Sequence, residues 1–150
     1  MIELFYETDF ELKDAQTWID WIVESMKNEG KTLEDLNYIF CDDEYLLQIN
    51  RQYLDHDYYT DVIGFDNSIE DELMGDIFIS VERIKDNAEQ NGVSFENELA
   101  RVVIHGILHF AGYMDKEPDD KELMTAKENQ YLETFSSYPV SYTHLRAHET

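Results

Sequence analysis

Two histidines four residues apart, His105 and His109, give the sequence its clearest chemistry. They belong to the run HGILHFAGYMD at residues 105–115, which we expect on a helix and the turn after it. Residues four apart on a helix face the same way, with about 5–6 Å between Cβ atoms, so two imidazoles can share one metal ion. Gly112 lets the chain reverse and bring Asp115 back as a third ligand. Three protein ligands leave a position for water, which is typical of catalytic metal sites.

The same histidine spacing also arises by chance on helices that are partly apolar. Zinc proteases place Glu directly after the first histidine as a general base, and here that position is Gly106, so this is not a protease helix of that kind. Glu98 lies on the same face as His105 but two turns away, roughly 10 Å, which is too far to act on water at the metal. The sequence therefore identifies no general base, and the metal would have to acidify water alone.

The acidic composition restricts how nucleic acid can bind. The 150 residues carry a formal net charge of -23, which repels phosphates and anionic lipid at long range. The alternative explanation of this acidity is a well-solvated, highly soluble surface with no role in choosing a partner. Any RNA contact must be local, through a few cations, and Arg101 is the candidate because it lies one turn before His105 on the same face. The alternative for Arg101 is a surface ion pair with Glu98.

Cysteine usage and hydropathy exclude several classes of protein. The single cysteine, Cys41, rules out an internal disulfide and a multi-cysteine zinc site, and its apolar surroundings predict a buried, inert thiol. The first residues do not form a basic region followed by an apolar stretch, and no run approaches a membrane-spanning length. We expect a cytoplasmic protein without membrane contact.

The histidine helix needs a scaffold, and 150 residues of which 43% are hydrophobic can form one packed domain. Apolar periodicity and capping residues predict strands over 2–6, 36–40, 62–65 and 75–79, and helices over 12–28, 44–53, 81–91, 95–111 and 119–135. This order favours an α+β single domain, with a small mixed four-stranded sheet packed with about five helices. The early strand–helix–strand unit favours parallel pairing, and the two later strands favour an antiparallel pair.

The end of the chain lacks the apolar patterns that predict helices and strands in the rest of the sequence. Residues 140–150 have no helical or strand period and look like translated adaptor sequence. We therefore expect the domain to span 1–138, followed by a non-native or disordered tail over 139–150. His144 and His148 in this tail have the spacing of a metal pair, but we exclude them from the site.

The run at 105–115 resembles the pattern His-Gly-x-Leu-His-x-x-Gly-Tyr-Asp-His of the YbeY family, the endoribonucleases and rRNA maturation factors of bacteria. The runs TDVIGF at 60–65 and GDIFIS at 75–80 resemble two strand motifs of that family at about the right spacing. Met124 and Glu128 fall where its last helix is patterned. The resemblance covers roughly residues 36–135, and the combined motifs are highly specific.

This chain departs from the family pattern at three positions. Asp115 stands where the third ligand is usually histidine, and Met114 stands where an aspartate precedes that ligand. In the family, the tyrosine equivalent to Tyr53 is usually followed by an arginine that is thought to matter for RNA. In this chain Leu54 stands at that position. Arg51 or Arg101 could supply the missing cation.

The resemblance implies a metal-dependent, single-strand-specific endoribonuclease in rRNA processing and ribosome maturation or quality control. It implies one Zn²⁺ per chain on His105, His109 and Asp115, although two histidines and a carboxylate also suit Fe(II) and other first-row metals. The implied partners are single-stranded RNA, rRNA and the ribosome or its proteins. Two alternatives stay open, a non-catalytic ribosome assembly factor stabilised by its metal and a 2-His-1-carboxylate iron enzyme. The oligomeric state is not predicted.

Overall fold

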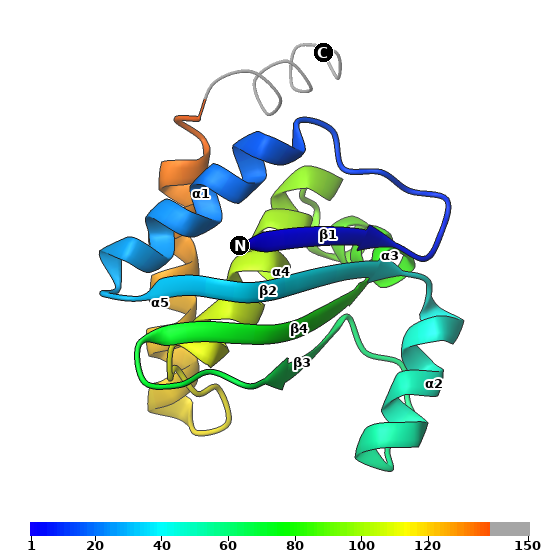
Figure 1. Cartoon of the computed structure of the whole chain (residues 1–150). Helices are drawn as coiled ribbons and strands as arrows, with labels where there is room; N and C mark the ends of the chain where they lie inside the picture. The colour runs from blue at the N-terminus through cyan, green and yellow to red at the C-terminus, as the bar shows by residue number, and fades with distance from the viewer. Residues whose placement is uncertain (139–150) are drawn as a thin grey trace.

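A four-stranded mixed sheet organises the computed structural model, which describes residues 1–138 (Figure 1). The tail expected over 139–150 lies outside the described residues. Along the chain the elements are β1 (Ile2–Tyr6), α1 (Ala15–Asn28), β2 (Thr32–Cys41), α2 (Asp43–Leu54), β3 (Val62–Asp66), β4 (Glu72–Ser80), α3 (Val81–Asn91), α4 (Phe95–Phe110) and α5 (Pro118–Phe135). Within residues 1–138 the predicted α+β class, with five helices around a small mixed sheet, is confirmed.

The strands lie in the order β1-β2-β4-β3. β2 pairs in parallel with both β1 and β4, whereas β3 pairs antiparallel with β4, so both predicted kinds of pairing are present. β2 and β4 are longer than predicted because residues 32–33 of one pair with residues 72–73 of the other. These segments are too short to show a strand pattern by themselves, and their extension becomes clear only from the pairing of β2 with β4.

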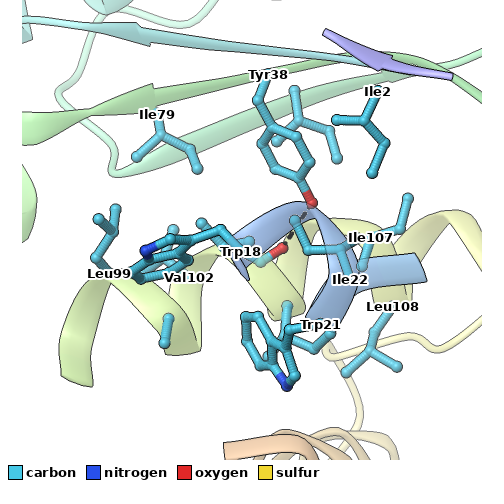
Figure 2. Close-up of a cluster of buried hydrophobic side chains, with 14 of the residues drawn as sticks. Ile2, Trp18, Trp21, Ile22, Tyr38, Ile79, Leu99, Val102, Ile107 and Leu108 are labelled. Carbon is cyan, nitrogen blue, oxygen red and sulfur yellow. Dashed lines mark hydrogen bonds between the residues drawn. The ribbon is translucent and has the colours of Figure 1, made fainter. Parts of the chain in front are cut away.

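The main hydrophobic core lies between one face of the sheet and helices α1, α3, α4 and α5. Figure 2 shows Trp18, Trp21 and Ile22 of α1 meeting apolar side chains of α4 beneath Tyr38 of the sheet. The buried hydroxyl of Tyr38 donates a hydrogen bond to the carbonyl of Val103 in α4 at 3.0 Å. This bond and the packing around it fix α4 against the sheet.

The opposite face of the sheet carries a smaller cluster of Cys41, Leu46 and Ile63, covered by α2. Figure 1 shows α2 projecting beside the β3 side of the sheet. Cys41 is fully buried and unpaired, as predicted, and burial raises the pKa of its thiol to about 12. A thiol with that pKa is inert near neutral pH.

The central helix α4 begins where the serine cap was predicted, with Ser94 Oγ accepting from Asn97 N at 3.1 Å. Gly106 allows the helix to approach β4 closely, since a Cβ at this position would lie 3.1 Å from Ile77 Cγ2. Among residues 1–138, none of the helices has the length and apolar character needed to span a membrane.

Candidate metal centre

Three side chains from the end of α4 and the following loop converge on one point. His105 Nε2 and His109 Nε2 are 3.1 Å apart, and Asp115 Oδ2 lies 3.3 Å from the first and 3.2 Å from the second. Among residues 1–138, this is the group of three His, Cys, Asp or Glu side chains whose potential ligand atoms gather within 4.8 Å of one another. The structure thus brings together the three residues that the sequence analysis selected.

The triangle formed by these donor atoms fits a metal ion. Three ligands of a tetrahedral ion with bonds of about 2.0–2.1 Å lie about 3.3–3.4 Å apart, whereas a facial octahedral set with the same bonds has edges of about 2.8–3.0 Å. The edges of 3.1, 3.2 and 3.3 Å run from just above the octahedral values to the lower tetrahedral value, so the triangle suits an ion of this size in either geometry. Two imidazoles and a carboxylate are also ordinary ligands of first-row transition metals.

Both histidines already have the tautomer that a metal ligand needs. His109 Nδ1 lies 2.9 Å from the backbone carbonyl of Tyr113, and a carbonyl can only accept, so Nδ1 carries the proton. His105 Nδ1 lies 2.6 Å from Glu128 Oε2, and an ionised carboxylate again only accepts. In the neutral form of each ring this leaves the lone pair on Nε2, which faces the shared point. Such outer partners fix ring orientation in known metal sites.

Charge around His105 favours its cationic form. Burial opposes protonation of this imidazole, but the hydrogen bond and negative charge of Glu128 outweigh burial, and Asp115 and Asp61 add to them. The pKa of His105 is therefore raised. The same negative charges would stabilise a metal cation at this point, where it would compete with the proton for Nε2.

The three side chains lie at the wall of a cavity of about 370 Å³ between β3 and α4. Its lining includes Asp61 and Gly64 from the β3 side and Phe110 from α4. A second cavity of about 180 Å³ shares Asp61 and His105 with the first and is also lined by Arg101 and Glu128. The donor triangle is therefore open to a ligand, as a catalytic site requires.

Asp61, which directly precedes β3, borders both cavities near the donor triangle. The backbone N–H groups of Asp61 and Val62 favour the ionised form of this carboxyl and act to lower its pKa. Burial outweighs them and raises the pKa of Asp61, although the nearby charge of His105 also acts in the opposite direction. No spacing in the sequence relates Asp61 to the histidines.

The arginines proposed to contact RNA are both engaged by acidic or amide groups. Arg101 donates to Glu128 Oε1 and to Asn129 Oδ1, each at 2.8 Å, so its ion pair forms with α5 and not with Glu98. Arg51, in α2, pairs with the exposed Asp57. A phosphate contact by Arg101 stays a prediction.

Glu128 and the carbonyl of Tyr113 are site groups that the sequence analysis did not identify. Glu128 joins His105 to Arg101, but it lies on α5, and only the packing of α5 against α4 brings it there. Tyr113 contributes its backbone carbonyl to the site, and a backbone group cannot be recognised from a pattern of residue types. A family-like residue at position 128 was the only available signal.

Comparison with known proteins gives consistent matches. The family described as Endoribonuclease YbeY matches residues 3–136. The chain is 51% identical over 135 residues to "Endoribonuclease YbeY" of Flavobacterium psychrophilum, covering 90% of this chain and 96% of that protein. It is 49% identical over 122 residues to the protein of the same name from Bacteroides thetaiotaomicron, covering 81% and 88%. The solution structure of TM1509 from Thermotoga maritima matches with a TM-score of 0.68 and 28% identity, covering 99% of this chain and 93% of that one.

Proposed function

This chain belongs to the Endoribonuclease YbeY family, and we propose that it cleaves single-stranded RNA in the cavity between β3 and α4. The observation that carries the proposal is the donor triangle of His105, His109 and Asp115 at the wall of this cavity. Family membership supports the reaction, and the triangle supports its dependence on a metal.

We propose Zn²⁺ as the metal, one per chain, because histidine nitrogen and carboxylate oxygen are ordinary zinc ligands and three protein ligands leave a position for water. When bound, the ion would act as a Lewis acid on a phosphoryl oxygen and lower the pKa of water. The chain's own residues prepare this chemistry. Glu128 and the Tyr113 carbonyl hold the Nδ1 protons, so that both Nε2 atoms stay available as ligands.

Local positive charge must overcome the acidic field of the protein. A divalent ion on two neutral histidines and one carboxylate keeps about one positive charge, which attracts a phosphate. Arg101 adds a second cation at the neighbouring cavity, where its side chain is 33% exposed. A guanidinium has five N–H donors, so donors are left for a phosphate after the bonds to Glu128 and Asn129. These two cations define the expected position of the RNA backbone.

The wider role that we propose is in rRNA processing and ribosome maturation or quality control, with rRNA and the ribosome as partners in the cytoplasm. Membership of a family named for an endoribonuclease supports the RNA substrate. The rival role, a non-catalytic assembly factor whose metal only stabilises the fold, predicts RNA binding without cleavage. The iron-enzyme alternative predicts iron as the native metal and no hydrolysis.

The test combines metal analysis with an RNA cleavage assay on the purified full chain. We expect about one zinc per chain and cleavage of a single-stranded oligoribonucleotide but not of a duplex. His105→Ala should lose both the metal and the cleavage. His56→Ala is the control, because the His56 ring stacks on Tyr58 and lies outside the cavity lining. Unchanged metal in His105→Ala would contradict the site, and metal binding without cleavage in the parent would favour the assembly factor.

A further inference from the structure

A nearly buried carboxylate lies at the end of α1, away from the cavity. The side chain of Glu29 is only 9% exposed. Its Oε1 accepts from the hydroxyl of Tyr113 at 2.6 Å, and its Oε2 accepts from Lys127 Nζ at 3.1 Å and from the hydroxyl of Tyr131. Three donors from two distant parts of the chain thus meet on one side chain.

These contacts offset the cost of burying the Glu29 carboxylate. Removing a carboxylate from water is unfavourable, and an ion pair with a partly exposed lysine contributes little stabilising free energy. Burial opposes ionisation of Glu29, but the hydrogen bonds from Tyr113, Tyr131 and Lys127 outweigh it and lower its pKa. Glu29 therefore stays ionised in the folded state, and its function depends on the segments that donate hydrogen bonds to it.

One of the three donors belongs to the loop that carries the third ligand. Tyr113 N donates to the carbonyl of Leu108 at 3.1 Å, and the Tyr113 carbonyl accepts from His109 Nδ1. Asp115 follows two residues later and meets His109 Nε2 at 3.2 Å. The loop reverses at Gly112, where φ is +107°, and a glycine by itself leaves the direction of the chain undetermined. The backbone of Tyr113 bonds to α4, whereas its phenol ties the loop to Glu29 at the end of α1.

We propose that Glu29 is a positioning residue for the metal centre. By accepting the hydroxyl of Tyr113, Glu29 holds the loop over residues 111–115 so that the Tyr113 carbonyl orients His109 and Asp115 reaches the donor triangle. The inference rests on the proposed metal site, and it assigns a role in that site to a residue on a different element. Lys127, with Nζ 5.6 Å from the Tyr113 ring centroid, supports the same ring.

Two matched tyrosine variants separate positioning from stability. Tyr113→Phe and Tyr131→Phe each remove one hydroxyl from the same carboxylate, but only Tyr113 belongs to the ligand loop. Both should lower the melting temperature of the metal-free full chain. Tyr113→Phe should weaken Zn²⁺ binding about tenfold in competition with a chromophoric chelator and shift the visible bands of the Co²⁺-loaded protein, whereas Tyr131→Phe should change neither. Kinetically, Tyr113→Phe should lower kcat for an oligoribonucleotide with little change in KM.

Glu29→Ala tests the carboxylate itself. It should weaken Zn²⁺ binding as Tyr113→Phe does. The double variant should lose no more Zn²⁺ affinity than the single variant with the larger loss, because both changes remove the same contact. Additive losses would overturn the proposal, as would parent-like affinity in Tyr113→Phe or an equal loss in Tyr131→Phe. A parent chain that binds no Zn²⁺ or Co²⁺ would overturn the metal site and the positioning role together, a result distinct from the other three.

Discussion

The ligands of the proposed centre come from two regions that are held in different ways. His105 and His109 project from α4, a helix packed on the sheet, and their separation follows from the helical repeat. Asp115 lies on the loop after Gly112, and its place depends on contacts with α1 and α5 through Tyr113. A helix thus positions two ligands through local geometry, whereas the third needs tertiary contacts. We expect the helix ligands to dominate affinity and the loop to tune it.

Removing a ligand should have the largest effect. We expect His109→Ala to weaken Zn²⁺ binding more than 100-fold, beyond the roughly 10–100-fold typical of losing an outer partner. Asp115→Ala should weaken it strongly but less than His109→Ala does. Asp115→His should retain the metal, because histidine is an ordinary zinc ligand. Chelator competition would measure all three.

The exposed carboxylate Asp9 provides the control for these variants, since Asp9→Ala should bind Zn²⁺ as the parent does. If Asp115→Ala binds metal and cuts RNA like the parent, Asp115 is not a ligand and the loop has no part in the centre. If Asp115→Ala loses more affinity than His109→Ala, the ranking of helix over loop is wrong.

Glu128→Gln should come next, with Zn²⁺ affinity about 10–100-fold lower. The amide removes the charge that holds the Nδ1 proton of His105 and leaves Arg101 without its ionic partner. Glu133→Gln is the matched control, because Glu133 is exposed on the same helix. Equal affinity in the two variants, read from the same competition assay, would show that α5 does not support the helix ligands.

Gly112→Ala should lower stability by about 1–3 kcal/mol, since an L side chain is strained at φ +107°. Gly92→Ala is a good comparison, because Gly92 has φ +66° and neither glycine has an atom within 4 Å of an added Cβ. Both variants should melt earlier, but only Gly112→Ala should also weaken Zn²⁺ binding. A parent-like metal affinity in Gly112→Ala would mean that the loop backbone does not set the ligand position.

The smallest expected effect is on the pH dependence of stability. The pKa of Glu29 is lowered in the folded protein, so its ionised form stabilises the fold above the unfolded pKa of about 4.3. That contribution is lost as the pH falls through the folded pKa. Melting curves of chelator-treated parent and Glu29→Gln should therefore differ most near neutral pH and converge in acid. A difference that stays constant down to acidic pH would contradict the lowered pKa.

Much of the fold followed from local patterns. The apolar period of α4, its Ser94 cap and the pairing types of the strands all appear as predicted, because helical and strand periodicity act over a few neighbouring residues. The limits that differ have two causes, one in the local backbone and one in strand pairing. α1 was predicted from residue 12 but begins at Ala15, after Asp14 in the left-handed region with φ 52°, and β2 and β4 are extended by their pairing with each other.

The sequence by itself determined which side chains could bind a metal, because the spacing of His105 and His109 on a helix fixes their geometry whatever surrounds them. Only the tertiary structure decided what orients them. Glu128 reaches His105 across 23 residues and Glu29 reaches Tyr113 across 84. An amphipathic pattern shows that a helix face is buried but not which helix covers it, so contacts between helices cannot be read from one sequence.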